Sequence, residues 1–227
     1  MTAGLSRASV PDREAGPTTL VLARHGRTAA TERGVFTGRD GDDPPLSAAG
    51  EGEAARLAAA LAALGTQASP VPGVPAVSAL VASPMARTRG TAAAAGQRLG
   101  LAVAADEGWA EMAFGSWNGL TYAQIAERNP AALAGWWQDP AAAPPGGESF
   151  DALADRVAAA RRRTVEAYPG RVVAVVTHGG PVRVVVREAL DAGPAALWRL
   201  RVTPCALTVV RYWPDGGVEV VVVNVAA

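Results

Sequence analysis

The two histidines of the chain occupy matching positions, because each directly follows an apolar run. His25 lies between Arg24 and Gly26 in "VLARHGRTAATERGVF", and His178 ends the run in "VVAVVTHGG". A neutral imidazole nitrogen can act as a nucleophile, and a guanidinium can bind two oxygens of one phosphate group. Two histidines and a carboxylate could also hold zinc, but Arg24 beside His25 would repel a cation. The pattern therefore favours a phosphate site.

Two further groups could complete such a site. Arg87 closely follows a second apolar run, in "SPMARTRGTA", and His178 supplies a second histidine that can be protonated. Together they would bind the charge of a phosphoryl group during its transfer. Each histidine precedes a glycine, which allows close backbone approach, and His178 stands before a predicted helix N-terminus. A strand-end histidine can simply hydrogen-bond a loop carbonyl, but two in matching positions favour a functional site.

The elements that must position these residues alternate between strands and helices. Short apolar runs predict strands at 18–25, 78–84, 101–105 and 171–178, and a hairpin over 205–225. Caps and terminating glycines predict helices at 48–65, from Pro84 towards Gly100, over 150–168 and after Pro181. Residues 108–147 are expected to be irregular. This order predicts an α/β fold, a three-layer α/β/α sandwich with a mostly parallel central sheet, with ligands beyond the carboxyl ends of its strands.

Composition limits the classes of protein that fit. The chain has 227 residues, which suits a single domain over 18–227 after a flexible N-terminal tail at 1–17. A net charge of zero gives no reason to expect nucleic acid or an anionic membrane as a partner. The single cysteine, Cys205, excludes an intramolecular disulfide and a cysteine-based zinc site. No apolar run suits a membrane helix or a secretory signal, so we expect a cytoplasmic protein, and a homodimer stays open.

Five blocks in order resemble the histidine phosphatase superfamily, with the fold of phosphoglycerate mutases. They are "LARHGRT", "SPMARTRGTA", "WAEMAFGSWNGLTYAQI", "PPGGESFDALADRV" and "VVTHGGPVR", and they span nearly everything after Thr18. The third block is similar to the family's Glu-x-x-x-Gly-x-Trp-x-Gly segment, and the fourth to a Gly-Glu-Ser stretch of its phosphatase members. The acid-phosphatase and phytase branch reads Arg-His-Gly-x-Arg-x-Pro, which "RHGRTAA" does not match. The resemblance therefore favours a phosphatase-type member of the phosphoglycerate mutase branch.

The resemblance implies a role for each matching position. His25 would be the nucleophile and form a phosphohistidine, while Arg24, Arg87 and His178 would bind the phosphoryl oxygens. Glu111 would protonate the leaving oxygen and then activate water. No metal and no cofactor would be needed. Thr37, Gly38 and Arg39 match the family's loop at the mouth of the substrate pocket.

The chain departs from the family pattern at two positions. Arg27 stands where Glu or Gln is usual, and would be either a solvated loop charge or a contact to a second anionic group of the substrate. Thr31 stands where Asn is usual, and its hydroxyl can donate only one hydrogen bond. Ser149 could contact substrate or cap a helix, with Glu148 beside it as an alternative acid. Trp136 and Trp137 could roof the pocket, although packing beneath the Pro-rich loop is the favoured interpretation.

The function expected from these residues is that of a phosphoric monoester hydrolase, a metal-independent phosphomonoesterase acting on a small phosphorylated metabolite. The alternative is a phosphoglycerate mutase, but the stretch between Gly119 and His178 is short for a mutase and carries "GGES". The unusual Thr31 also leaves open a binding module without activity. The substrate is undetermined: α-ribazole phosphate, phosphosugars, phosphoglycerate derivatives and an intermediate of specialised metabolism are all open.

Overall fold

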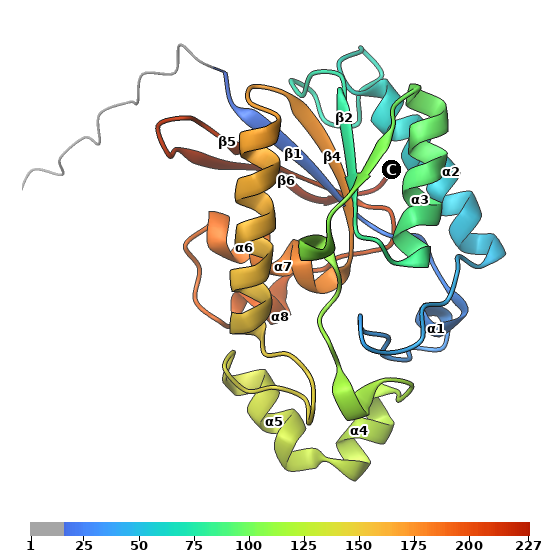
Figure 1. Cartoon of the computed structure of the whole chain (residues 1–227), viewed down its shortest axis with the longest axis vertical. Coiled ribbons are helices and arrows are strands. Elements are labelled where there is room, and N and C mark those ends of the chain that lie inside the picture. Colours follow the sequence, from blue (N-terminus) through green and yellow to red (C-terminus); the bar gives the residue numbers. More distant parts are fainter. Residues whose placement is uncertain (1–15) are drawn as a thin grey trace, which may run out of the picture.

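The computed structural model describes residues 16–227. The predicted N-terminal tail therefore lies outside the described residues, except for its last two positions. The elements follow the expected order of strands and helices (Figure 1). The strands are β1 (Thr18–Arg24), β2 (Ala79–Ala82), β3 (Val103–Ala105), β4 (Val172–Thr177), β5 (Leu207–Tyr212) and β6 (Val218–Val225). The helices are α1 (Ala29–Glu32), α2 (Ala48–Ala63), α3 (Ala86–Leu99), α4 (Tyr122–Arg128), α5 (Pro130–Gln138), α6 (Phe150–Ala167), α7 (Gly179–Ala189) and α8 (Ala196–Arg199).

The strands form one six-stranded sheet with the order β3-β2-β4-β1-β5-β6. β2 is parallel to both β3 and β4, and β4 is parallel to β1. β5 runs antiparallel to β1, and the predicted C-terminal hairpin adds β6 at the edge. The mostly parallel sheet predicted from the sequence is confirmed. The carboxyl ends of β1, β2 and β4 consequently meet at one edge of the sheet.

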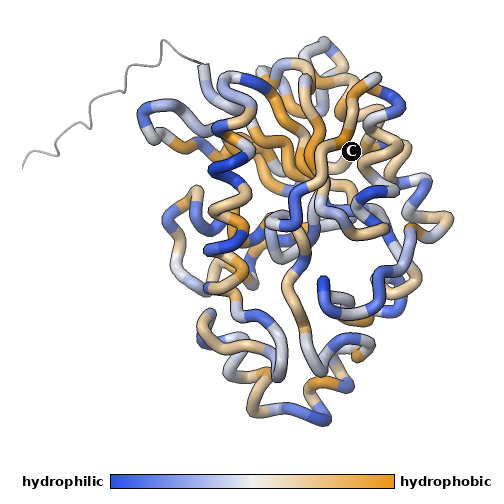
Figure 2. The backbone as a smooth tube through the Cα atoms, viewed as in Figure 1, coloured by the Kyte–Doolittle hydropathy of each residue, from blue (hydrophilic) through white to orange (hydrophobic). Residues whose placement is uncertain are grey.

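Two helical layers cover the sheet, which makes the architecture the expected α/β/α sandwich. Alternate residues of a strand point to opposite faces, so Leu20 and Leu22 of β1 pack in one buried cluster with α6 and α7. Val21 and Ala23 pack in a second cluster with α2 and α3. Figure 2 shows the consequence, with hydrophobic residues concentrated along the central strands.

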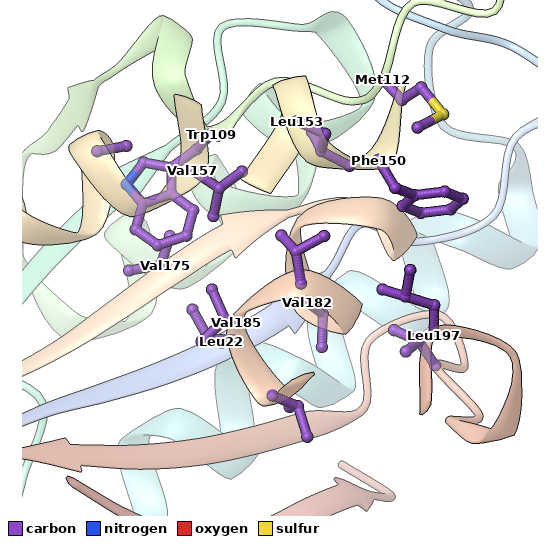
Figure 3. Close-up of a cluster of buried hydrophobic side chains, with 14 of the residues drawn as sticks. Leu22, Trp109, Met112, Phe150, Leu153, Val157, Val175, Val182, Val185 and Leu197 are labelled. Carbon is purple, nitrogen blue, oxygen red and sulfur yellow. The ribbon is translucent and has the colours of Figure 1, made fainter. Parts of the chain in front are cut away.

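Helices α6 and α7 pack together in the buried cluster on one face of the sheet. Figure 3 shows Leu153 and Val157 of α6 together with Val182 and Val185 of α7 in the buried cluster. Ser149 begins α6 by accepting a hydrogen bond from Ala152 N at 3.1 Å. Helix α7 begins two residues before the proline that was expected to open it, directly after His178. That early start brings the helix N-terminus to the end of β4.

The stretch predicted to be irregular, 108–147, contains two α-helices. Helix α4 begins with a capping box, in which Thr121 and Gln124 exchange side-chain and backbone hydrogen bonds. Helix α5 follows at once with Pro130 in its first turn. These two helices lie together beyond the sheet, at the bottom of Figure 1. No helix among residues 16–227 is long and apolar enough to cross a membrane.

Candidate active site

Strand register brings the two histidines together. Arg24 of β1 is the register partner of Thr177 of β4, so the next residues, His25 and His178, are neighbours beyond the ends of parallel strands. Their ring centroids lie 5.1 Å apart, and both side chains are buried. The backbone N–H of His25 donates to Thr177 O at 2.9 Å, which continues the strand pairing into the site.

Hydrogen bonds determine which nitrogen of His25 is free. Nδ1 lies 2.7 Å from the carbonyl oxygen of Gly26. A carbonyl only accepts hydrogen bonds, so Nδ1 carries the proton and Nε2 of the neutral ring keeps its lone pair. His178 is oriented from another strand end, because its Nε2 lies 2.8 Å from the Ser83 hydroxyl that follows β2. Its Nδ1 is buried and has no hydrogen-bond partner within 16–227.

Two arginines lie close to the imidazoles, and each has an N–H donor without an acceptor among the described residues. Arg24 Nη1 donates to Val202 O at 2.9 Å, and Arg87 Nη2 donates to Thr37 O at 3.0 Å. Arg87 is 1% exposed and also pairs with Asp43 at 3.3 Å. The Nε atoms of Arg24 and Arg87 are buried, and neither has an acceptor among the described residues. A buried donor without an acceptor costs free energy, and such donors are suited to binding an anion.

The site keeps both imidazoles neutral at physiological pH. Burial lowers the pKa of His25 well below its usual range, and the charges of Arg24 and Arg87 lower it further. Burial also lowers the pKa of His178 well below its usual range, and the charges of His25 and of nearby arginines lower it further. Burial lowers the pKa of the Arg24 guanidinium too, although the charge of Glu111 opposes this. A bound phosphate dianion would oppose the lowering of both imidazole pKa values, because it favours their charged forms.

Glu111 lies on a segment that two neighbouring elements hold in place. Its Oε1 accepts hydrogen bonds from Met112 N at 3.0 Å and from Gly180 N at 3.2 Å, in the first turn of α7. The Thr177 hydroxyl at the end of β4 donates to Trp109 O at 2.6 Å, two residues before Glu111. The carboxylate is therefore fixed relative to the helix that follows His178.

These groups surround a cavity of about 250 Å³. Of the residues predicted from the sequence, the cavity is lined by Arg24, His25, Thr31, Thr37 and Glu111. His178 contacts this set through His25, and Arg87 through Thr37. No three His, Cys, Asp or Glu side chains within the described part of the chain gather in a way that could hold a metal ion. Among the ionisable groups that line the cavity, Arg24, Arg183 and His25 outnumber Glu111, so the cavity suits an anion.

Besides Arg87 and His178, four of the predicted substrate contacts do not line this cavity. Arg27 is paired with Glu53 at 3.1 Å and is half-exposed, which favours the interpretation as a surface charge. Arg39 lies 3.6 Å from Glu148. Gly38 donates to Asn118 Oδ1 at 2.7 Å and packs too tightly against the 112–114 backbone to accept a side chain. Ser149 caps α6, so the structure accounts for it without a substrate.

Thr31 lines the cavity, but its hydroxyl is already used. The hydroxyl accepts a hydrogen bond from Thr28 N at 2.7 Å and donates its one proton to Thr28 O at 2.9 Å. The first of these contacts forms the capping box of α1, together with the Thr31 N–H that donates to the Thr28 hydroxyl at 3.2 Å. The single hydrogen bond that the Thr31 hydroxyl can donate is therefore used within α1, and no donor of the side chain remains for a phosphate.

The sequence interpretation missed two arginines. Arg183 of α7 lines the cavity, and a methyl group added at Gly179 would lie within 4 Å of Arg183, Glu111 and Arg24. Arg156 of α6 lies outside the cavity but donates to the carbonyl oxygen of Glu111 at 3.2 Å. Arg183 stands in the quoted block "VVTHGGPVR", and its spacing from His178, just over one helical turn, was the available signal. Arg156 had no such signal, since its partners are Glu148 and backbone carbonyls of a distant segment.

The remaining candidates have packing roles or line a second cavity. Both carboxylate oxygens of Glu148 bind Arg156, so this group is a poor alternative acid. Trp136 is buried against Phe150, as the packing interpretation expected. Trp137 is 49% exposed. Both tryptophans line a separate cavity next to the first one.

The chain belongs to the histidine phosphatase superfamily, because the family model of its branch 1 matches residues 20–225. This confirms the resemblance identified from the sequence blocks. A curated relative, "Bifunctional protein Rv2228c" of Mycobacterium tuberculosis, is 38% identical over 208 residues, which cover 92% of this chain and 54% of that protein. The glucosyl-3-phosphoglycerate phosphatase of M. tuberculosis is 36% identical over 127 residues, covering 52% of this chain and 56% of the relative. The chain thus spans about half the length of these curated relatives.

Other matches extend over most of both chains. The metal-independent phosphoserine phosphatase of Arabidopsis thaliana is 31% identical over 80% of this chain and 73% of its own length. The solved structure of mycobacterial glucosyl-3-phosphoglycerate phosphatase with VO3 has a TM-score of 0.77 and 29% identity, covering 91% of this chain and 98% of that one. The solved structure of YhfR from Bacillus stearothermophilus has a TM-score of 0.77 and 28% identity, and the match covers 90% of this chain and 96% of that one. The fold predicted from the sequence is therefore confirmed.

Proposed function

We propose that this chain is a phosphomonoesterase that needs no metal ion and hydrolyses a small phosphorylated metabolite through a phosphohistidine. One observation carries the proposal: two buried, neutral imidazoles lie side by side at strand ends, next to Arg24 and Arg87 with unpaired Nε donors. Relatives named as phosphatases, one of them as metal-independent, support the hydrolysis of a phosphate ester.

The first chemical step transfers the phosphoryl group to the enzyme. His25 Nε2 attacks phosphorus, because its Nδ1 proton is held by Gly26 O and the lone pair of Nε2 is free. The P–O bond of the ester breaks as the N–P bond forms. Glu111, in its protonated form, gives its proton to the departing oxygen. Arg24, Arg87 and Arg183 stabilise the charge on the phosphoryl oxygens. As that negative charge builds, it favours the protonated form of His178, which can then also stabilise the charge.

The second step returns the enzyme to its starting state. Glu111 is now a carboxylate and takes a proton from water, whose oxygen attacks the phosphorus of the phosphohistidine. The N–P bond breaks, inorganic phosphate leaves, and His25 is neutral again. The N–H of Gly180 donates to Glu111 Oε1 and can hold this side chain in both steps, so that one residue acts first as acid and then as base.

A labelling experiment tests the proposal. Wild type is mixed with a ³²P-labelled monoester in the presence of EDTA, and the reaction is quenched in base because phosphohistidine is labile in acid. We expect label on the protein and release of inorganic phosphate, with no label on His25→Ala. His178→Ala is the matched comparison: it should still carry label, at a much lower rate. Label on His25→Ala, or activity lost in EDTA and restored by zinc or magnesium, would reject the mechanism.

The same preparation separates hydrolysis from phosphoryl transfer between hydroxyls. A phosphoglycerate mutase would interconvert 2- and 3-phosphoglycerate after priming with bisphosphoglycerate, and would release little phosphate. We expect phosphate release to exceed interconversion. A dominant interconversion would replace the phosphatase proposal with the mutase.

A further inference from the structure

The cavity of about 250 Å³ that His25 and Glu111 line is called the phosphate cavity below. A second cavity, of about 210 Å³, lies beside it and is walled by aromatic side chains. The chain has only six tryptophans, three tyrosines and three phenylalanines. Seven of these twelve line this cavity: Phe36, Phe114, Phe150, Tyr122, Trp136, Trp137 and Trp198. A protein so poor in aromatic residues has thus gathered most of them at one place. We call this place the aromatic cavity.

The aromatic cavity is continuous with the proposed site through shared walls. Phe36, Glu111, Phe114 and Arg183 line both cavities. Glu111 therefore stands between the place where phosphorus would react and the aromatic side chains. The group that protonates the leaving oxygen must touch that oxygen. The carbon skeleton attached to it consequently has to extend past Glu111.

The walls of the aromatic cavity are held in place before any ligand binds. Trp136 stacks on Phe150 with ring centroids 5.3 Å apart, and Trp137 stacks on Trp198 at 5.6 Å. Trp198 also meets Trp136 edge-on at 4.7 Å, and its indole N–H donates to Trp137 O at 3.0 Å. These contacts join α5, α8 and the start of α6. Preformed walls reduce the entropy lost on binding.

The cavity's chemistry limits what it accepts. Its lining contains two charged groups, Glu111 and Arg183, and both lie at the side shared with the phosphate cavity. A charged group placed among the aromatic rings would lose its water and would gain only neutral partners, such as the buried Trp136 indole N–H, which has no acceptor among the described residues. The volume is below the roughly 300–1,000 Å³ that complete ligand pockets occupy, so it suits one ring system. Stacked indole and phenyl walls favour a flat ring.

We infer that the physiological substrate is a phosphomonoester whose leaving alcohol carries a flat, apolar ring, and that this ring occupies the aromatic cavity. The inference rests on the proposed function, because it takes Glu111 as the residue facing the leaving oxygen. It also sets this chain apart from relatives named for glucosyl-3-phosphoglycerate and phosphoserine. The leaving groups of those esters are polar or charged.

The test compares esters whose leaving alcohols have similar basicity. 2-Phenylethyl, 2-cyclohexylethyl and ethyl phosphate and O-phosphoserine are hydrolysed by wild type, and kcat/KM is measured for each. We expect 2-phenylethyl phosphate to exceed ethyl phosphate by about 10- to 100-fold, as for burial of one ring. The cyclohexyl ester should rank between them, and phosphoserine last. Equal values for the phenyl and ethyl esters would overturn the inference, and equality of phenyl and cyclohexyl would remove its flat-ring part.

Two variants locate the preference. Trp137 is half-exposed, so Trp137→Ala should fold, and we expect the phenyl-to-ethyl ratio to fall by about five- to tenfold. Leu190→Ala is the matched control, since Leu190 is 54% exposed and lines neither cavity, and its ratio should equal that of wild type. A ratio that is the same in Trp137→Ala as in wild type would place the ring elsewhere.

A binding measurement separates this inference from the proposed function. Calorimetry compares 2-phenylethylphosphonate with ethylphosphonate, neither of which can be hydrolysed. Tighter binding of the phenyl compound with no hydrolysis of any ester would support the aromatic cavity and reject the phosphatase. Hydrolysis of the esters without a phenyl preference in rate or binding would keep the phosphatase and reject the aromatic cavity as a subsite.

Discussion

Arg156 binds Glu148 through two hydrogen bonds, from Nε to Oε1 at 3.1 Å and from Nη2 to Oε2 at 2.8 Å. The same guanidinium donates to the carbonyl oxygens of Gly108, Ala110 and Glu111. Glu148 in turn accepts a hydrogen bond from the backbone of the same segment, at Ala113 N. The pair therefore fixes the segment that presents Glu111, although neither side chain lines the phosphate cavity. Arg156 is a positioning residue.

Replacing Arg156 by lysine should misplace Glu111 without removing it. An ammonium cannot reproduce the planar set of donors that contacts Glu148 and three carbonyl oxygens together. We expect kcat/KM for an alkyl phosphate to fall about tenfold or more, and that for p-nitrophenyl phosphate to fall much less, because nitrophenolate leaves without a proton. Steady-state kinetics on both esters measure the ratio, and thermal unfolding verifies the fold.

Arg163→Lys is the matched control for that variant. Arg163 also lies on α6 and pairs with Asp106, at the other end of the same segment, but its side chain is 55% exposed. Such an exposed pair contributes only about 0–1 kcal/mol, so both esters should react nearly as in wild type. Equal losses on the two esters in Arg156→Lys would mean that Arg156 supports the fold rather than the position of Glu111.

Glu111→Gln should separate the two steps of the reaction. General acid catalysis is typically worth about 10²–10⁴-fold, so kcat/KM for an alkyl phosphate should fall by that order. The loss for p-nitrophenyl phosphate should be far smaller, but breakdown of the phosphohistidine should slow because no base activates water. Rapid mixing should then show a burst of about one nitrophenolate per active site, followed by a slow steady state. Equal losses without a burst would remove Glu111 from both roles.

Gly180→Ala should reproduce part of the Glu111 defect while leaving the carboxylate in place. A methyl group at Gly180 would overlap Glu111 Oε1 and would lie 3.0 Å from Leu153 Cδ2. The flexible end of the glutamate can move aside more easily than the packed helix, so the fold should survive and the carboxylate should shift. We expect a loss that is larger for alkyl phosphate than for p-nitrophenyl phosphate. If Gly180→Ala hydrolyses both esters at wild-type rates, the contact between Gly180 and Glu111 has no effect on catalysis.

Much of the fold was predictable because it depends on local patterns. Apolar runs ending in His25 and His178 predict buried strands, and parallel pairing then brings their ends together. The region 108–147 was mispredicted because its glycines and prolines obscured shorter signals. The Thr121 and Gln124 capping box and Pro130 in a first helical turn were present in the sequence. Helix α5 also gains stability from packing against the distant Trp198, which no local window contains.

The site residues that directly follow a strand, such as His25 and His178, were predictable from the sequence. A residue was not predictable where its role depends on a contact between distant segments. Arg156 reaches three carbonyl oxygens more than 40 positions away in the chain. The sequence raised Trp137 as a possible roof of the pocket, but its stacking on Trp198 of α8 joins segments that no local pattern connects.

The two buried histidines should make folding stability depend on pH in a specific window. Burial holds the pKa values of His25 and His178 well below the usual range in the native state, whereas the unfolded chain has ordinary imidazoles near about 6.5. Below that value the unfolded chain binds protons that the native protein does not, so the free energy of unfolding decreases as pH falls. The stabilising effect is complete above about pH 6.5 and is lost towards the lowered native pKa values.

The expected slope can be measured because these are the only histidines in the chain. Each should contribute up to about 1.4 kcal/mol per pH unit, which gives about 2.7 kcal/mol for both, before carboxylates begin to titrate near about pH 5. Urea unfolding at intervals between about pH 7 and 5 measures the free energy, and His178→Gln should halve the slope whatever its absolute stability. A free energy of unfolding that stays constant across this window would mean that both imidazoles accept protons in the folded protein. In that case Nε2 of His25 would not keep its lone pair at mildly acidic pH, and activity there would be lost as well.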